Sequence, residues 1–504
     1  MSDKKRKRKR RSALLDGRPI VFNKNKDPVS IFKRIFSSNW RMPTQISAIF
    51  VIAYIFVYSS DFLILLNPLD ALDSLNFSTT GGGVSDIRSD EVEVLKANIG
   101  IGIYISVLLY TLFFLKPVVK TLFSLPHLIL IILLLLFGMR YSDNPQEVFF
   151  SVVQIGIGIL IAIHYAEYVS KKNRWDRIFC FTILFPLFAV HFLSFIIFIF
   201  NSLDIFEYIS RSKRYGGLPG NPNVAGGNAV IGIWSVLYVL LDRKNGFLVD
   251  LYCVASLFLF VFTIAVSGSA TALIVSTTLV AIMIWLKFLS LFQNPKKKAT
   301  FVLSGILALS LIVGYALITS STENITETLT SSLGKESNFT GRAELWVIAI
   351  DAIIERPLLG WSYDQHETVL GDRRFKLPFE LAHFHNGFLD TAVAGGLLLL
   401  AAVFFNIYTY VKYYFKACVN DKHLSGIICP LIILILLNFS EYSLLRPLNV
   451  IFQFYLCAYF LILFTSMREK NVTNIPISVN SNYRDSLKRN RRKMSAAGGV
   501  RYRF

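Results

Sequence analysis

The sequence has few charged residues for its length. They make up 17% of its 504 residues, whereas an average soluble domain has roughly 25%. Hydrophobic residues make up 54%, and phenylalanine alone occurs 43 times. This shortage of charge excludes an ordinary soluble globular protein, and it indicates an all-α chain that crosses a membrane many times.

Cysteine is scarce as well. The five cysteines all lie in or beside apolar runs, and no two of them form a CxxC pair. This excludes a disulfide framework and a cysteine-based metal site. The sequence also lacks a clustered Asp/Glu set of the kind that holds Mg²⁺. We therefore predict no metal and no other cofactor.

We also expect no cleavable signal peptide. The first residues, "MSDKKRKRKRR", are too basic and too far from an apolar core to form one. The rest of the chain is rich in apolar runs, and a membrane span needs about 20 apolar residues. Twelve candidate spans lie near residues 44–66, 97–115, 121–139, 148–166, 178–200, 225–241, 247–266, 270–290, 299–319, 387–411, 425–440 and 448–467.

The charges between these runs predict how the chain is oriented. The net charge is +19, and much of the excess lies in two tails and in alternate loops. The basic residues of the alternate loops are Lys116, Lys120, Lys171, Lys172, Arg174, Arg177, Arg243, Lys244, Lys296, Lys297, Lys298, Lys412, Lys416 and Lys422. Basic loops remain in the cytoplasm, so we expect both termini there and the basic tails against anionic lipid. No nucleic-acid partner is expected.

This orientation gives a domain plan. Residues 1–42 form a basic cytoplasmic tail, 43–319 carry nine spans, 320–386 form one long outer loop, 387–467 carry three spans, and 468–504 form a second cytoplasmic tail. Within the long loop, apolar residues at helical spacing over Thr340–Glu355 predict a helix that ends near Pro357. Such a helix would lie at the outer interface and cover a site.

Four polar stretches fall on the predicted outer side. They are "RSKRYGGLPGNPNVAGG" at 211–227, "NFTGRAELWVIAIDAIIERPLLGWSYDQ" at 338–365, "AHFHNGFLD" at 382–390 and "NFSEYSLLRP" at 438–447. The third holds two of the seven histidines in the chain. Arginine, histidine and glutamate gathered on one face, beside glycines and helix starts, favour a functional site there.

These stretches resemble a known family. "RYGGLPGNPNVAGG" at 214–227, "GRAELW" at 341–346, "ERPLLGWSYD" at 355–364 and "HNGFLDTAVAGGL" at 385–397 together are similar to the O-antigen ligase/O-antigen polymerase superfamily of membrane glycosyltransferases. The resemblance extends over roughly residues 40–467 and implies a GT-C-like helical fold. One turn departs from it: in "SGSATAL" at 267–273, Ala270 stands where members often carry an arginine.

The resemblance implies a transfer reaction in a bacterial cytoplasmic (inner) membrane. The donor is a glycan on a polyisoprenyl (undecaprenyl) diphosphate, and the site faces the periplasm or exterior. Transfer to lipid A-core, as by an O-antigen ligase in lipopolysaccharide biosynthesis, is the first expectation. A growing O-antigen or exopolysaccharide (polymerase) and a protein hydroxyl (O-oligosaccharyltransferase) are the alternative acceptors.

The residues themselves suit this chemistry. A diphosphate leaving group must be held and neutralised, and an arginine fork matches phosphate oxygens bidentately. Arg214 and Arg342 are the candidates for that role, and the glycine-rich loop with Gly217, Asn221 and Asn223 brings backbone N–H groups close to a ligand. The simpler interpretations are a solvated loop charge for Arg214 and a surface residue at a helix start for Arg342.

The acceptor hydroxyl loses a proton as it attacks, and histidine suits that role. His385 is the candidate base, because it aligns with the family's His-Asn pair. The predicted substrate contacts at the same place are Asn386, His383, Glu441, Arg373 and Arg374. The simpler alternatives are that the histidines and Asn386 cap a helix, that Glu441 is an interfacial carboxylate, and that the arginines form a charged loop tip.

A twelve-helix secondary transporter is the main alternative from another class. Transporters usually carry ionisable residues at mid-span. The predicted spans are nearly free of them apart from His164 and His191, and the polar residues gather at one outer face instead. The pattern therefore favours the enzyme.

Overall fold

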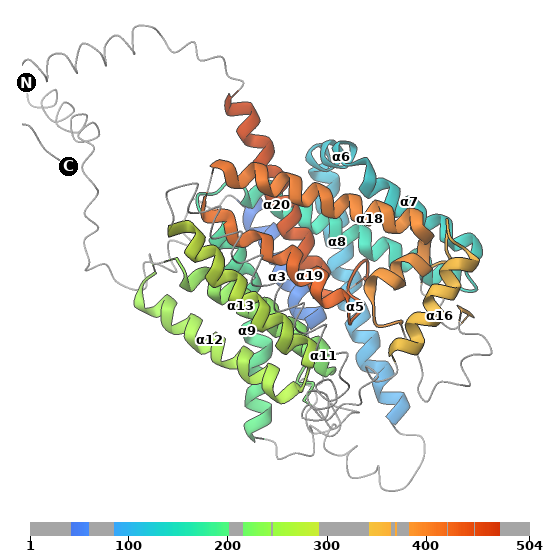
Figure 1. The fold of residues 1–504 in the computed structure, drawn as a ribbon, viewed down its shortest axis with the longest axis horizontal. Helices are drawn as coiled ribbons and strands as arrows, with labels where there is room; N and C mark the ends of the chain where they lie inside the picture. The colour runs from blue at the N-terminus through green and yellow to red at the C-terminus, as the bar shows by residue number, and fades with distance from the viewer. Residues whose placement is uncertain are drawn as a thin grey trace, which may run out of the picture.

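The computed structural model describes residues 42–59, 85–200, 215–242, 245–291, 342–363, 368–369, 383–420, 422–447 and 449–473. Every regular element within these ranges is a helix (Figure 1). A helix satisfies its own backbone hydrogen bonds, which a lipid-embedded segment must do because no water is available there. The predicted all-α class is therefore confirmed for the described residues.

The helices run in the following order. They are α3 (Met42–Ser59), α5 (Ser85–Phe113), α6 (Leu115–Ser124), α7 (Pro126–Gly138), α8 (Pro145–Val169), α9 (Trp175–Phe200), α11 (Pro222–Leu240), α12 (Phe247–Ser267), α13 (Ala270–Leu291), α16 (Arg342–Glu355), α18 (Gly387–Asn420), α19 (Cys429–Asn438) and α20 (Val450–Thr473). Two short 3₁₀ helices, η2 (Met139–Tyr141) and η5 (Lys422–Ile428), precede α8 and α19.

The number of spans is only partly settled. Seven described helices, namely α8, α9, α11, α12, α13, α18 and α20, are long and apolar enough to cross a membrane. Shorter apolar helices at Gln45–Tyr58, Pro126–Tyr141 and Leu424–Asn438 coincide with three further predicted runs. The predicted run 299–319 lies outside the described residues, so the prediction of twelve spans is not confirmed.

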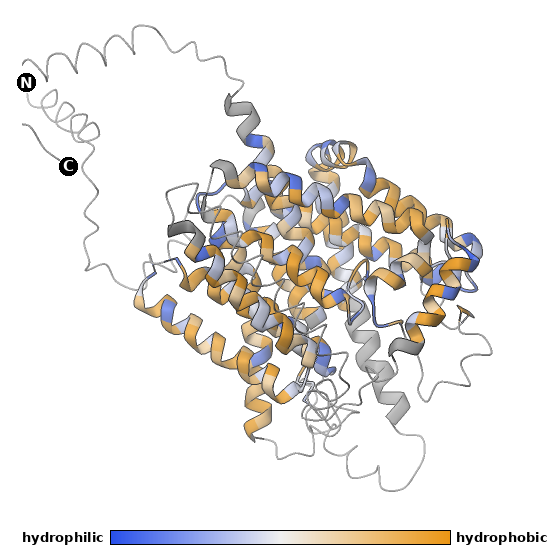
Figure 2. Cartoon of the chain, viewed as in Figure 1, coloured by the Kyte–Doolittle hydropathy of each residue, from blue (hydrophilic) through white to orange (hydrophobic). Residues whose placement is uncertain are grey.

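The helices divide into central and peripheral ones. In the apolar stretches of α11 and α20, 78% and 83% is buried, whereas in those of α12 and α13 only 33% and 28% is buried. At the centre, the ring of Phe454 stacks on Phe179 at 5.6 Å, and the indole N–H of Trp234 donates to the carbonyl of Gly426. Helices α12 and α13 are apolar along most of their length (Figure 2), and many of their apolar side chains are exposed, as on helices that face lipid.

The connection between α5 and α7 corrects the sequence prediction of a simple loop around Lys116 and Lys120. The chain turns by 91° at Phe114 and continues as helix α6. Val118 and Thr121 on one face of α6 are buried, while both lysines lie on its exposed side. Pro117 is tolerated there because the first turn of a helix needs no intrahelical N–H bond. The basic segment is therefore an amphipathic helix roughly perpendicular to α5.

Helix α18 is broken at two adjacent glycines. Gly395 and Gly396 have non-helical dihedral angles, with φ of −133° and +66°. The segment 357–362, which begins with a turn, fills the break: Leu397 N–H donates to the carbonyl of Pro357 (2.7 Å), and Trp361 N–H donates to that of Val393 (2.8 Å). Backbone groups freed by a break must find such partners when no water is present.

Glycine is required at the points of contact in this break. A Cβ on Gly396 would lie 2.3 Å from the carbonyl carbon of Leu358, and one on Gly360 would lie 2.4 Å from the carbonyl oxygen of Val393. Both glycines also have positive φ, a region that residues with a Cβ rarely adopt. The two motifs "ERPLLGW" and "AVAGGL" are therefore two halves of one packing unit.

The helix predicted in the long loop is confirmed, with bounds Arg342–Glu355 for α16. It packs beside the first part of α18 (Figure 1) through a small apolar cluster of Leu345, Ala349, Ala352, Phe384 and Val393. The indole N–H of Trp361 donates to the carbonyl of Ala352 at 2.9 Å and ties the break segment to the same helix.

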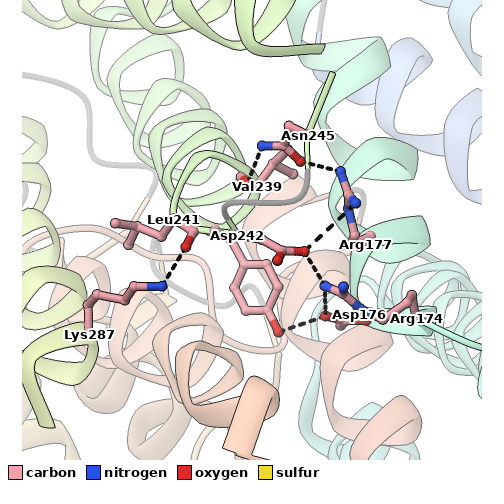
Figure 3. A network of polar contacts seen from close by, with 9 residues as sticks. Arg174, Asp176, Arg177, Val239, Leu241, Asp242, Asn245 and Lys287 are labelled. Atoms are coloured by element: carbon pink, nitrogen blue, oxygen red, sulfur yellow. Dashed lines mark hydrogen bonds and ion pairs between the residues drawn. The ribbon is translucent and has the colours of Figure 1, made fainter. Parts of the chain in front are cut away.

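One end of the helix bundle is basic and tightly connected. Figure 3 shows the network there: Arg174 contacts Asp176 and Asp242 (2.6 Å to the latter), and Arg177 contacts Asp242 and Asn245. This network joins the start of α9 to the α11–α12 connection. Arg468 of α20 donates to the carbonyl of Ser170 at the end of α8. The described parts of two connections predicted to be cytoplasmic, at 170–177 and 241–246, and the late part of α20 therefore lie at one end of the bundle.

The loops predicted to lie outside meet at the other end. Thr368 bonds to Asp143, just before α8, and Tyr363 donates to the carbonyl of Leu445, just before α20. Since Ser170 and Arg468 close the far ends of these two helices, the two sets of loops lie a helix length apart. For the 25 residues of α8 that is about 37 Å.

The break in α18 predicts a strong effect of Gly396→Ala. Forcing a Cβ into a left-handed position against backbone should destabilise the protein by about 1–3 kcal/mol or more. The measurement is thermal unfolding of the purified protein in detergent. Gly156→Ala in α8 is the matched control, because its Cβ meets nothing within 4 Å and alanine favours a helix by about 0.5–1 kcal/mol. Equal melting temperatures for the two variants would refute the packing account.

The separation of the two ends predicts a labelling pattern. In a cysteine-free background, a cysteine at the exposed Arg140 of η2 should react with a membrane-impermeant maleimide added outside the cell membrane. A cysteine at the exposed Lys171, at the basic end, should react only after permeabilisation. The reverse pattern would place the polar stretches in the cytoplasm and remove the basis for a site at the outer face.

Candidate functional site

The histidine segment 383–386 is fixed by its central residue, Phe384. This side chain is fully buried against α16. Its backbone N–H donates to Asp390 Oδ1 at 3.0 Å, and its carbonyl accepts the indole N–H of Trp346 at 3.2 Å. The two flanking histidines are therefore held on a rigid support rather than on a free loop.

The turn into α18 places His385 in an unusual backbone conformation. His385 has φ +52°, and its N–H donates to His383 Nδ1 at 3.1 Å. Asn386 is the N-cap: its Oδ1 accepts the N–H groups of Phe388 and Leu389 at 3.1 and 3.2 Å. Left-handed backbone at a residue other than glycine costs about 1–3 kcal/mol and often marks a functional position.

The loop that carries Glu441 is built to meet this turn. The N–H of Gly387 donates to the carbonyl of Glu441 at 3.1 Å. A Cβ on Gly387 would lie 1.9 Å from Asn438 Oδ1, so only glycine fits there. That same oxygen accepts the N–H groups of Ser443 and Leu444 at 2.9 and 2.8 Å. Both sides of the site are thus rigid before any ligand arrives.

The structure brings together three of the predicted site residues. His385 Nδ1 lies 3.7 Å from Glu441 Oε2, and the two side chains are 29% and 18% exposed. The His383 and His385 rings lie 4.1 Å apart, between centroids. His385 Nδ1 makes no hydrogen bond within the described part of the chain. A carboxylate facing an imidazole at this distance stabilises the ring once it takes up a proton.

A metal ion is the other occupant that this cluster could accept. One ligand atom each from His383, His385 and Glu441 lie within 4.8 Å of one another, and two imidazoles with a carboxylate are a transition-metal donor set. However, His383 Nδ1 accepts the N–H of His385, so the neutral ring carries its proton on Nε2. A metal would have to break that hydrogen bond or displace that proton. The geometry fits a hydrogen-bonded set better than a metal centre.

The glycine-rich loop closes tightly at the start of α11. Gly217 has φ +56°, and the neighbouring N–H of Leu218 donates to Ser194 Oγ at 3.0 Å. Asn221 caps α11 by accepting the N–H groups of Asn223 and Val224 at 2.8 and 3.3 Å. These residues therefore have structural roles, and their predicted contact with phosphate stays a prediction.

Four predicted arginines lie beyond what the structure describes. Arg214, Arg373 and Arg374 fall outside the described residues. Arg342 is the first residue of α16, but its side chain is also outside the described set. Their roles therefore remain predictions.

The turn that carries Ala270 is described, and it meets the loop before Glu441 through a hydrogen bond of 2.8 Å from Ser440 Oγ to Thr271 Oγ1.

Sequence reasoning missed the residues that position the site. Asp390 is 98% buried and holds the N–H of Phe384, and Trp346 holds the carbonyl of the same residue. A signal for Asp390 was present, because an acid at the start of an apolar span is expensive unless it has a partner. Arg446, whose guanidinium lies 5.6 Å from the ring centre of Tyr442, also went unassigned.

The bundle and its polar end define a polytopic helical membrane protein. Residues 255–404 match the O-antigen ligase family model, a range that includes His385 but neither Glu441 nor the glycine-rich loop. The chain is also similar to the exopolysaccharide production protein ExoQ of Rhizobium meliloti (strain 1021), at 24% identity over 139 residues. That alignment covers 26% of this chain and 31% of the relative. Both comparisons support the resemblance to the O-antigen ligase/O-antigen polymerase superfamily that the motifs indicate.

The hydrogen bond at His383 Nδ1 predicts that the site needs no metal. The purified protein should contain no stoichiometric transition metal by mass spectrometry, and its transfer activity should survive EDTA. One metal ion per chain in the wild-type protein, absent from His383→Ala and required for activity, would show that the metal interpretation is correct instead.

Proposed function

We propose that the protein is a membrane glycosyltransferase. It moves a glycan from a polyisoprenyl (undecaprenyl) diphosphate carrier to an acceptor hydroxyl at the outer face of the bacterial inner membrane. The observation that carries this proposal is the His385–Glu441 pair, 3.7 Å apart on two rigid loops at the end of the bundle opposite the basic loops. The superfamily supplies the substrate class.

In the proposed reaction His385 is the general base. As the acceptor oxygen attacks the anomeric carbon of the donor sugar, its proton passes to the imidazole. The bond from the anomeric carbon to the diphosphate oxygen breaks, and the diphosphate leaves with the electron pair. Glu441 stabilises the imidazolium that forms, much as a carboxylate does beside other catalytic histidines.

The leaving diphosphate needs positive charge rather than a proton donor. We assign this role to Arg342 and Arg214, with backbone N–H groups of the glycine-rich loop at the start of α11 as additional donors. No metal takes part in this scheme, because the arginines supply the charge. His383 acts indirectly, since its ring holds the N–H of His385.

The acceptor has three candidates, and the comparisons bear on two of them. Transfer to lipid A-core, the reaction of an O-antigen ligase, is the acceptor choice suggested by the family description that matches residues 255–404. Addition to a growing chain, the reaction of a polymerase, is favoured by the similarity to a protein named for exopolysaccharide production. Assays with one lipid-linked donor and either lipid A-core or a glycan repeat as acceptor separate the two, and a peptide acceptor tests protein glycosylation.

The transporter alternative is not favoured. The comparisons name polysaccharide proteins, and each of the three histidines buried in the described helices has a side-chain partner on another helix. His164 bonds to Thr111 at 2.9 Å, His191 to Thr263 at 3.1 Å, and His127 to Asn406 at 3.2 Å. Such bonds hold helices together in lipid.

The role of His385 is tested best with His385→Asn. Asparagine tolerates left-handed backbone better than alanine does, so the turn is kept while the base is lost. Removing a general base lowers the rate by about 10²–10⁴-fold. We expect a loss in this range at unchanged donor binding and melting temperature, a smaller loss for Glu441→Gln and the smallest for His383→Ala. The measurement is glycan transfer by purified protein. Transfer by His385→Asn at the wild-type rate would leave helix capping as the only role of this residue.

A further inference from the structure

The loop between α19 and α20 carries one arginine, Arg446, which lies near the ring of Tyr442. Its guanidinium carbon lies 5.6 Å from the ring centre of Tyr442, and the ring of Tyr442 lies 5.9 Å from that of His383. Since His383 and His385 are themselves 4.1 Å apart, one continuous set of side chains joins the cation to the proposed base.

The backbone around Arg446 is held in place before any ligand binds. Leu445 has φ +54°, a strained conformation for a residue with a branched side chain. It is kept there because its side chain is buried and its carbonyl accepts the hydroxyl of Tyr363. Pro447 follows, and a residue before proline is restricted to extended conformations. Strain that the surroundings enforce in this way is typical of ligand clamps.

Within the described structure the charge of Arg446 meets an aromatic ring but no opposite charge. Its side chain is exposed, and it forms no ion pair with a carboxylate of the described residues. The contact with Tyr442 is a cation–π contact with the ring. It uses none of the N–H groups in the guanidinium plane for a hydrogen bond. The planar N–H fork is therefore available to an anion with paired oxygens.

We propose that Arg446 is a further donor-binding residue, which grips the diphosphate of the lipid-linked donor beside His385. This assignment rests on the proposed function. The fork would place a phosphate at the same end of the bundle as the imidazole, so that the leaving group and the base face one sugar carbon. The simpler alternative is an arginine that only packs on Tyr442 and touches headgroup phosphates of the bilayer.

The test measures binding of undecaprenyl diphosphate without sugar to the full-length protein in nanodiscs. Arg446→Gln keeps a polar side chain over Tyr442 but removes the charge and the fork. We expect about tenfold weaker binding or more, as for the loss of one charge-assisted contact, with an unchanged melting temperature. Arg446→Lys should recover only part of the loss. Arg140→Gln, which removes an exposed arginine of η2 at the same end, is the matched control and should bind as the wild type does.

The outcomes separate this assignment from the proposed function. If the wild-type protein does not bind undecaprenyl diphosphate, the proposed function itself fails. If the wild type binds but Arg446→Gln binds equally well, only the assignment of Arg446 fails. An equal loss for Arg140→Gln would show a general charge effect and overturn the assignment. If the weaker binding of undecaprenyl diphosphate by Arg446→Gln disappears in discs rich in phosphatidylglycerol, that result would also overturn the assignment, because the arginine would then recognise lipid headgroups.

Discussion

The site depends on a backbone constraint: a helix broken inside an apolar bundle must have its freed N–H and C=O groups satisfied by protein. The break of α18 at Gly395–Gly396 meets that requirement by taking in the segment 357–362. Because this segment continues directly from α16, the break also fixes that helix against the first part of α18. Phe384 then fits between them and sets the position of the two histidines.

This dependence divides the recognisable motifs into scaffold and chemistry. The glycines of "AVAGGL", the tryptophan of "ERPLLGW" and the asparagine of "HNGFLD" close a break, hold a carbonyl and cap a helix, respectively. Few polar groups remain for the reaction, chiefly the imidazole of His385, the carboxylate of Glu441 and arginines around them. A rigid scaffold with few reactive groups suits a transfer in which the diphosphate is already a good leaving group, because positioning then contributes much of the rate.

Much of this arrangement could be predicted from the sequence, and the remainder has physical reasons. Apolar length predicted the spans of α8 to α13, α18 and α20, and helical spacing with Pro357 predicted α16 to within two residues. Motif chemistry assigned His383, His385 and Glu441 to one site, and the structure brings one polar atom of each within 4.8 Å of the others, while their roles stay predictions. The sequence could not predict the turn at Phe114 or the filled break, because both depend on packing between segments far apart in the chain. For the same reason Asp390, whose bond to Phe384 closes a turn, was counted as part of a span. Arg446 was hidden because its surroundings come from three separate loops.

The central claim is that the lipid diphosphate and the acceptor meet at the His385–Glu441 pair. The most direct measurement is an electron cryomicroscopy structure of the protein in a nanodisc with a non-transferable lipid-linked glycan donor. The account predicts diphosphate density at the end of the bundle formed by the loops before α8, α18 and α20, with the anomeric carbon within reach of the His385 ring. Density for the diphosphate at the basic end, among Arg174, Arg177 and Lys287, or a sugar held far from His385, would contradict it.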